Sequence, residues 1–176
     1  MVHRTRDLLA TICKPEQTAF IRGRDISMNA LLLHDVTAYV TETDRDVSVV
    51  STDYFKCFDR VPRSTLYKVH DKIYGKGFGD WLRTMYTDTM RIISVNGVLS
   101  RAIPVGGGSP QGCPYSPSGW AVLAESLADM LRADPRVKGV MLPGGIELNL
   151  IHFADDMQVF CEGDDSALAA LDVIER

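Results

Sequence analysis

Residues 151–160 read Ile-His-Phe-Ala-Asp-Asp-Met-Gln-Val-Phe, two apolar runs separated by adjacent carboxylates. The runs on either side, residues 146–153 and 157–161, have the length and composition of strands, and Asp is favoured in the turns that join strands. The stretch therefore predicts a β-hairpin with Asp155 and Asp156 at its tip. Two neighbouring carboxylates repel one another, and burying them is costly unless they are neutralised.

A further acidic residue, Asp53, lies in a run rich in β-branched residues, Val-Ser-Val-Val-Ser-Thr-Asp-Tyr over residues 47–54. This run predicts a strand with Asp53 at its C-terminal end. Three carboxylates brought together would need a bound divalent cation or protonation, and Mg²⁺ is the usual ion where phosphates react. A pair of cations ~3.5–4 Å apart activates a hydroxyl and stabilises a leaving pyrophosphate. The alternative is an ordinary turn at Asp155 and Asp156 and a helix entry at Asp53.

Other patterns indicate helices and turns along the rest of the chain. Helices are expected over residues 25–40 with Asp25 or Ser27 as N-cap, from Pro62 to about Ile73, over 80–88 and over 118–132, the last being the longest. Residues 75–79 are expected to form a break.

A second hairpin is predicted around Asn96-Gly97, the signal of a type I′ turn, between strands at residues 91–95 and 98–105. A glycine-rich loop follows at residues 106–110. Antiparallel hairpins separated by long helices predict an α+β fold, with the helices packed on one face of the sheet. Asp53 and the acidic hairpin could then converge at one end of that sheet.

Bulk composition is that of a globular domain: 176 residues, 45% hydrophobic and 24% charged. The net charge of −4 argues mildly against a general nucleic-acid binder, although basic residues gather between His3 and Arg24. Four widely separated cysteines without a Cys-x-x-Cys pair indicate reduced, non-ligating thiols. We find no apolar stretch of membrane-spanning length and no secretory signal, which predicts an intracellular protein, nuclear or cytoplasmic.

Several motifs occur in a fixed order. They are Asp53-Tyr54-Phe55-Lys56-Cys57-Phe58-Asp59-Arg60-Val61, then Ser109-Pro110-Gln111-Gly112-Cys113-Pro114-Tyr115-Ser116-Pro117, then Phe153-Ala154-Asp155-Asp156. This order resembles the reverse transcriptase family, most closely the non-LTR (LINE-type) retrotransposon polymerases. Residues 15–24 are similar to the finger-region motif of that family, and Val95-Asn96-Gly97 to its hairpin before the Gln-Gly loop. The resemblance covers roughly residues 17–160.

The resemblance implies an RNA-directed DNA polymerase with a right-hand-polymerase palm. Such an enzyme transfers a nucleotide from a dNTP to the 3′-OH of a DNA primer on an RNA template, using Mg²⁺ or Mn²⁺. By the same resemblance Asp53, Asp155 and Asp156 are the catalytic metal ligands, and the backbone carbonyl of Tyr54 adds a ligand. Phe58 takes the aromatic position that excludes a 2′-hydroxyl, the group that separates ribonucleotides from deoxyribonucleotides. Without the motif, Phe58 would be interpreted as a core residue.

The Gln111-Gly112 pair corresponds to the family's loop against the incoming nucleotide and template base, where glycine permits close backbone approach. Its alternative is a flexible hairpin exit. Arg22 and Arg24 are candidate contacts to phosphate or template, or solvated surface residues.

The chain also departs from the family pattern. Residues 106–110 are Gly-Gly-Gly-Ser-Pro where LINE-type relatives carry Arg or Lys, and Cys57 stands where they carry Ala. We expect residues 1–46 to be a partial fingers region and residues 47–176 the palm, with the thumb, earlier finger strands and any endonuclease absent.

Two rival functions stay open. One is a catalytically inactive remnant or nucleic-acid-binding module with a palm fold. The other is a different palm-type metal enzyme, such as a nucleotidyl cyclase, which Phe58 and the Gln111-Gly112 loop disfavour. The sequence does not specify the retrotransposon, the RNA template or the oligomeric state.

Overall fold

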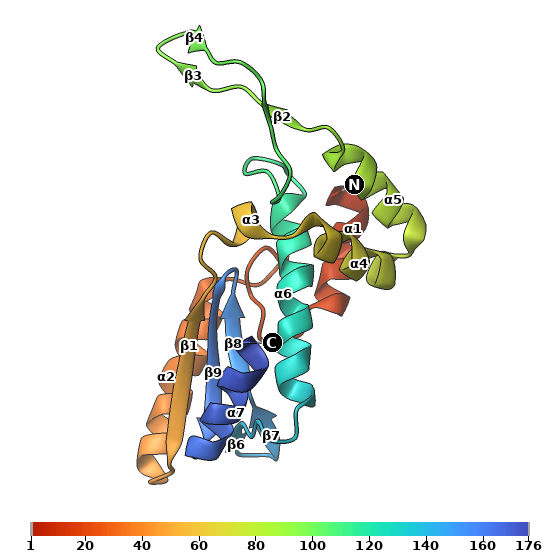
Figure 1. The fold of residues 1–176 in the computed structure, drawn as a ribbon. Helices are drawn as coiled ribbons and strands as arrows, with labels where there is room; N and C mark the ends of the chain where they lie inside the picture. Colours follow the sequence, from red (N-terminus) through yellow and green to blue (C-terminus); the bar gives the residue numbers. More distant parts are fainter. Residues whose placement is uncertain (1, 176) are drawn as a thin grey trace. The chain divides into compact units, whose positions relative to one another are not determined.

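The computed structural model describes residues 2–175, which form two compact units. The first unit holds α1 (Val2–Ile12), α2 (Ile26–Glu42), β1 (Val47–Asp53), most of α6 (Ser116–Ala133), β6 (Val140–Leu142), β7 (Ile146–Leu148), β8 (Leu150–Phe153), β9 (Asp156–Glu162) and α7 (Asp164–Glu175) (Figure 1). The second unit, residues 55–119, holds α3 (Cys57–Arg60), α4 (Arg63–Tyr74), α5 (Lys76–Tyr86), β2 (Met90–Arg91), β3 (Ser94–Val95), β4 (Val98–Leu99), β5 (Ile103–Pro104) and the first turn of α6. The units do not test the expected division into fingers and palm, which stays a prediction.

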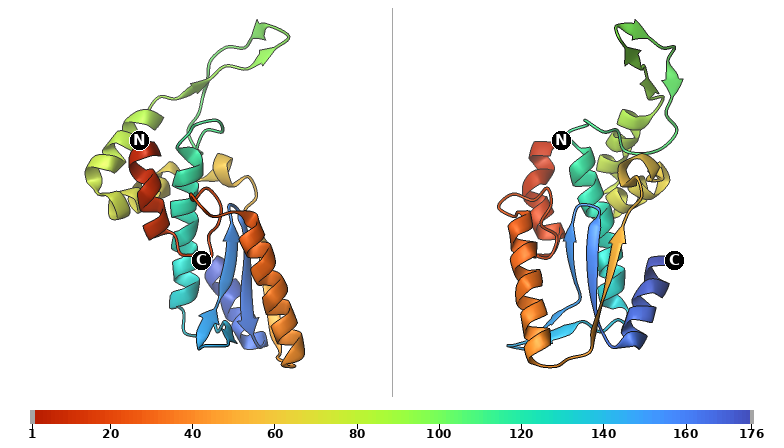
Figure 2. Two further views of the ribbon diagram at one scale, coloured as in Figure 1. Left: turned by 180° about the vertical axis from the view of Figure 1, so that it is seen from behind. Right: turned by 90° about the vertical axis from the view of Figure 1, so that its left-hand side faces the viewer.

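The first unit is built around an antiparallel sheet with the strand order β1-β9-β8. Because side chains alternate along a strand, Met157, Val159 and Cys161 share one face of β9, where they pack with residues of α6 and α7. Phe160 lies on the opposite face and packs with Ile151 of β8 and Val36 of α2. Figure 2 shows α2 on one side of the sheet and α6 and α7 on the other.

The predicted α+β class is confirmed, with two differences in detail. The helices cover both faces of the sheet rather than one, because α2 packs on the face that carries Phe160. The expected strand over residues 146–153 is divided at Asn149: β7 pairs with β6, whereas β8 pairs with β9. The two halves of one apolar run therefore pair with two different strands, and the composition of the run does not indicate where it divides.

Local signals predict most helix boundaries close to where they lie. The Asp25 side chain accepts a hydrogen bond from the Ser27 backbone N–H at 2.8 Å, as expected of an N-cap. The expected break at residues 75–79 is wrong, since α5 begins at Lys76 and only Gly75, at φ 85°, interrupts the helices. Gly79 is helical, and a Cβ there would lie 1.6 Å from the Asp71 carboxylate, so its small size serves the packing of α5 against α4.

The second hairpin is confirmed at its turn. Asn96 and Gly97 have φ values of 49° and 82°, as a type I′ turn requires, and Val95 pairs with Val98 across it. Its strands are shorter than expected, because β2–β5 and β3–β4 form separate two-residue ladders.

Candidate active site

Asp53 and Asp156 are direct register partners where β1 meets β9. Partners in an antiparallel pair have Cα atoms roughly 4.5–5.5 Å apart and side chains on the same face. Both residues are exposed, and Asp155 precedes Asp156 in the turn between β8 and β9. The predicted convergence of these three residues at one end of the sheet is confirmed.

The donor chemistry of this end of the sheet suits a hard divalent cation, because carboxylate oxygens come from two neighbouring strands. Within residues 2–175, however, no three His, Cys, Asp or Glu side chains are already gathered as a metal site. Assignment of Asp53, Asp155, Asp156 and the Tyr54 carbonyl as metal ligands stays a prediction.

A pocket of about 290 Å³ lies beside Asp156, between α2 and the sheet. It is lined by Ile26, Asn29, Ala30, Leu33, Ser51, Thr52, Ile151, Phe153, Asp156, Met157 and Gln158. The face of the sheet that carries the carboxylate pair is therefore only partly covered by α2.

The turn that carries Asp155 has an unusual backbone. Ala154 has φ 59°, in the left-handed region that residues with a Cβ seldom adopt, and its side chain is buried. The Trp120 indole N–H donates to the Ala154 carbonyl at 2.8 Å, and the Ala154 N–H donates to Gln17 Oε1 at 3.4 Å. Side chains from outside the hairpin thus bond both polar backbone groups of Ala154.

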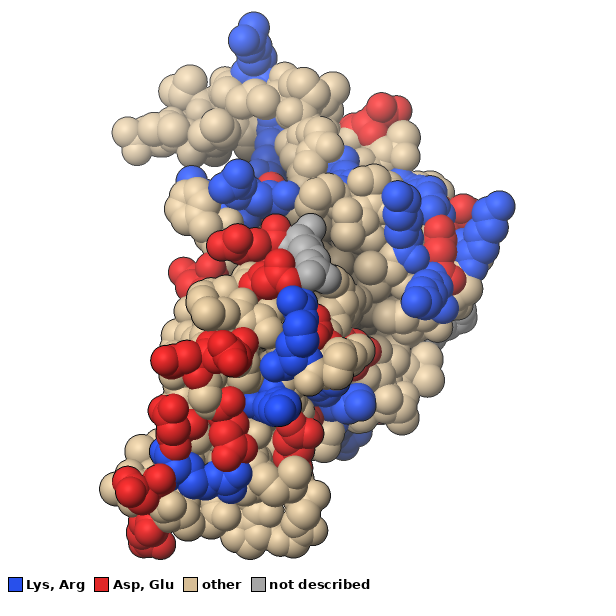
Figure 3. Space-filling view, turned by 60° about the horizontal axis from the view of Figure 1, so that its bottom comes forward, with Lys and Arg blue, Asp and Glu red and all other residues tan. Residues whose placement is uncertain are grey.

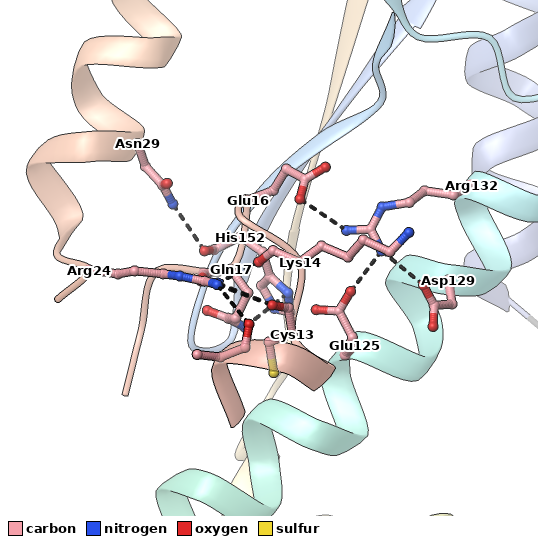
Figure 4. A network of polar contacts seen from close by, with 11 residues as sticks. Cys13, Lys14, Glu16, Gln17, Arg24, Asn29, Glu125, Asp129, Arg132 and His152 are labelled. Atoms are coloured by element: carbon pink, nitrogen blue, oxygen red, sulfur yellow. Dashed lines mark hydrogen bonds and ion pairs between the residues drawn. The ribbon is translucent and has the colours of Figure 1, made fainter. Parts of the chain in front are cut away.

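Gln17 and His152 form a buried pair next to this turn (Figure 4). Gln17 Nε2 lies 3.1 Å from His152 Nδ1, and both side chains are almost entirely inaccessible to water. Gln17 Oε1 already accepts from the N–H of Ala19 at 3.0 Å and from that of Ala154. Gln17 Nε2 must therefore be the donor, which leaves His152 Nδ1 as the acceptor of a neutral ring. Burial lowers the pKa of His152 to about 4, which also favours the neutral ring.

Main-chain bonds attach the segment before α2 to the edge strand β8. The Thr18 N–H donates to the His152 carbonyl at 3.1 Å, and the His152 N–H donates to the Glu16 carbonyl at 3.0 Å. Asn29 of α2 donates to the same His152 carbonyl at 3.0 Å. The finger-like motif and the acidic hairpin are consequently parts of one hydrogen-bonded structure.

Arg24 has a structural use in this unit. Its guanidinium donates to the carbonyls of Ala10, Cys13, Lys14 and Gln17. The Ala10 carbonyl lies in the last turn of α1, where carbonyls lack a partner within the helix. Arg22 is exposed. Contact of Arg22 or Arg24 with phosphate or template stays a prediction.

Arg132 is the centre of an ion-pair cluster that joins α6 to the segment that carries Gln17. Arg132 Nη1 lies 2.7 Å from Glu125 and 3.0 Å from Asp129, both on α6, and Arg132 Nη2 lies 3.7 Å from Glu16 (Figure 4). Burial raises the pKa of Glu125, whereas its bond to Arg132 opposes that shift. The cluster links α6 to the residue immediately before Gln17.

In the second unit, the loop that precedes Gln111 is bonded to the residues around Phe58. The Ser109 N–H donates to the Phe58 carbonyl at 2.6 Å, and the Gly108 N–H donates to the Val61 carbonyl at 3.0 Å. Gln111 Nε2 donates to the Asp59 carboxylate at 3.4 Å. The predicted steric-gate residue and the predicted nucleotide loop are therefore held together, although their roles in binding stay predictions.

Glycine is required at two positions of this loop for different reasons. Gly108 has φ 74°, and a Cβ there would lie 2.6 Å from the Asp59 carbonyl oxygen. Gly112 has φ 84°, and a Cβ there would meet nothing within 4 Å, so its conformation alone favours glycine. Buried hydroxyls add support, since Ser109 lies 3.1 Å from the Tyr86 hydroxyl and donates to Ser116 at 2.7 Å.

Sequence reasoning does not find the groups that support the carboxylates. In the sequence, Gln17 stands out only as part of a motif, and Trp120 only as a residue with helical spacing. His152 offers a usable signal, since a histidine inside an apolar strand must find a buried hydrogen-bond partner. Their partners come from distant segments, which no local pattern identifies.

Surface charge is mixed on the face that Figure 3 shows, where acidic and basic side chains lie interspersed. This agrees with the net charge of −4. Across residues 2–175, the helices are too short or too polar for any of them to cross a membrane.

The antiparallel sheet, with carboxylates at the ends of paired strands and helices on its faces, defines a polymerase palm. Solved structures agree on the fold. Truncated apo telomerase of Candida tropicalis matches with a TM-score of 0.70 at 12% identity, over 99% of this chain and 36% of that one. Telomerase of Candida albicans in complex with a fragment of telomeric RNA matches with a TM-score of 0.66 at 12% identity, over 99% of this chain and 31% of that one.

The sequence comparisons identify the family. The family model described as reverse transcriptase (RNA-dependent DNA polymerase) matches residues 1–176, and the chain belongs to that family. A 149 kDa protein of transposon TX1 from Xenopus laevis is 29% identical over 88% of this chain, and the Pol polyprotein of retrotransposable element R2 from Popillia japonica is 26% identical over 85%. The resemblance to non-LTR retrotransposon polymerases is thereby confirmed. The chain spans only 12% and 21% of the length of these two relatives.

Proposed function

We propose that this chain carries the catalytic centre of an RNA-directed DNA polymerase of the retrotransposon type. The reaction joins the α-phosphate of a dNTP to the 3′-OH of a DNA primer paired with an RNA template and releases pyrophosphate. The observation that carries the proposal is the register pairing of Asp53 with Asp156, with Asp155 in the adjoining turn. Membership of the reverse transcriptase family supports it.

The residues that would hold Mg²⁺, or Mn²⁺ in its place, are Asp53, Asp155 and Asp156, with the Tyr54 carbonyl as a further ligand. When bound, the metal supplies activation of the primer hydroxyl and stabilisation of the pyrophosphate charge. The chain itself supplies alignment, because β1 and β9 hold two carboxylates on one face of a hydrogen-bonded ladder.

Substrate roles are proposed for residues of both units. Phe58 would exclude the 2′-hydroxyl of ribonucleotides, and Gln111 with Gly112 would lie against the incoming nucleotide. The bond from Ser109 to the Phe58 carbonyl supports a common role, since it fixes the two segments to each other. Arg22 and Arg24 would contact phosphate or template, Arg24 only if part of its guanidinium is available beyond the carbonyls that it already bonds.

The second candidate is a catalytically inactive remnant with a palm fold, and weak attraction for phosphate favours it, because an active polymerase must hold a primer–template duplex. Net charge is −4 and the charges drawn in Figure 3 are interspersed, so phosphate attraction is weak. The two candidates differ in whether the carboxylates are needed for a chemical step.

Primer extension separates them. The purified chain would be incubated at low salt with a DNA primer annealed to an RNA template, dNTPs and Mg²⁺. We expect weak extension that Asp156→Asn abolishes and that Asp165→Asn, an exposed acid at the start of α7, leaves unchanged. Extension that survives both Asp53→Asn and Asp156→Asn would refute the catalytic assignment. A folded wild-type chain that never extends a primer, alone or joined to the flanking regions of a longer relative, would favour the inactive remnant.

A further inference from the structure

We propose that Gln17 and Trp120 are positioning residues that hold the Ala154–Asp155 turn from two sides and so fix Asp155 and Asp156 relative to Asp53. The positioning role rests on the proposed function. The two hydrogen bonds that Gln17 and Trp120 make with the backbone of Ala154, here called the clamp, can be tested without it. All the residues concerned belong to the first unit.

Trp120 contacts both segments that carry the carboxylates. Its indole N–H donates to the Ala154 carbonyl at 2.8 Å in a buried setting, one residue before Asp155. Its ring meets the ring of Tyr54 edge-on, with centroids 5.1 Å apart and planes at 81°, one residue after Asp53. A single rigid side chain on α6 thus spans the two sides of the candidate site, which restricts how far they can separate.

Gln17 holds the same turn through the backbone N–H of Ala154, whereas Trp120 holds it through the Ala154 carbonyl. The Gln17 side-chain oxygen Oε1 accepts from the Ala154 N–H at 3.4 Å and from the Ala19 N–H at 3.0 Å, while the side-chain nitrogen Nε2 donates to His152 Nδ1 at 3.1 Å. The side chain is fully buried. Because every polar atom of the amide has a protein partner, Gln17 has one orientation that satisfies all of them.

The turn needs this outside support for two reasons. Ala154 has a Cβ but lies at φ 59°, a conformation in which glycine would be at ease and alanine is disfavoured. Ala154 is also buried, so water cannot readily replace a lost partner of its N–H or carbonyl. Removing either hydrogen bond of the clamp would leave the Ala154 carbonyl or N–H without a partner, next to Asp155. The turn could then change its conformation.

The variants are Trp120→Phe, which keeps an aromatic ring but loses the N–H, and Gln17→Met, which keeps the length but loses the amide. Trp81→Phe is the matched control, because Trp81 is a half-exposed residue of α5 in the other unit. Amide hydrogen exchange would be measured at Ala154 and Asp155, with Val159 in the middle of β9 as the internal reference. Primer extension would supply kcat, and KM for the dNTP.

We expect exchange at Ala154 to accelerate by about tenfold or more in each clamp variant, with Val159 and the Trp81→Phe control unchanged. We expect kcat to fall by about tenfold or more with KM for the dNTP unchanged, because small displacements of catalytic groups are costly. Protection of Ala154 that persists in both clamp variants overturns the clamp. Equal acceleration at Val159 shows only general loss of stability and also overturns it.

The two proposals fail in distinguishable ways. If the wild-type chain shows no synthesis, the proposed function fails, and exchange at Ala154 still decides whether the clamp exists. If the wild type is active and the clamp variants lose protection at Ala154 yet keep the wild-type kcat, the turn is held but does not position the carboxylates, and the positioning role is refuted.

Discussion

The buried imidazole of His152 should make folding stability fall in mild acid. Burial lowers its pKa from 6.5 to about 4, so between these values the unfolded state binds a proton that the folded state does not. Stability is therefore fully present above about pH 6.5 and is lost as the pH falls toward 4. A shift of this size corresponds to about 3 kcal/mol in total, of which about 2 kcal/mol is lost by pH 5.

The measurement is urea unfolding at pH 7.5 and pH 5.0 for the wild type and for His152→Gln. The variant is expected to be less stable at pH 7.5 but to lose about 2 kcal/mol less than the wild type between the two pH values. Burial also lowers the pKa of His70, but that contribution is common to both proteins and cancels. His34→Gln is the control, because the His34 side chain is 80% exposed. An identical pH dependence in wild type and His152→Gln would refute the reasoning.

Further predictions concern the second unit and nucleic-acid binding. Gly108→Ala should lower the free energy of unfolding in urea by about 2–4 kcal/mol, because Gly108 has a positive φ and lies close to the Asp59 carbonyl. Gly107→Ala is the control and should change it little, because a Cβ there would meet nothing within 4 Å. Equal effects of the two would argue against the close approach. Phe58→Val should let primer extension accept ribonucleotides while deoxynucleotide use is largely kept, and unchanged discrimination would return Phe58 to a core role. Binding to a primer–template duplex, followed by fluorescence anisotropy, should be weak, because a net charge of −4 gives little attraction for phosphate; tight binding at physiological salt would contradict this.

The acidic hairpin is predictable because its signals are local. Two strand-like runs flank Asp155 and Asp156, and Asp53 ends a β-branched run, so strand type and position follow from composition. The type I′ turn at Asn96-Gly97 follows in the same way, since few other residues adopt its backbone angles.

Other features of the fold cannot be predicted from local sequence, because they depend on contacts with residues far along the chain. Division of residues 146–153 into β7 and β8 follows from their pairing with β6 and β9, which the run itself does not encode. Gly79 lies inside α5, and its lack of a Cβ leaves room for the Asp71 carboxylate of α4, a contact that the local sequence does not show. Gln17 and Trp120 reach Ala154 from 137 and 34 residues away, so their role is visible only in the folded chain.

The central claim is that Asp53, Asp155 and Asp156 form one divalent-metal site, and Mn²⁺ titration of the folded chain tests it most directly. Free Mn²⁺ would be followed by electron paramagnetic resonance in the wild type, in Asp53→Asn and Asp156→Asn, and in the exposed control Asp165→Asn. We predict binding by the wild type and the control, weakened by about tenfold or more in each site variant, because each removes a charged oxygen ligand. Binding that is absent from the wild type, or unchanged by both site variants, would contradict the claim.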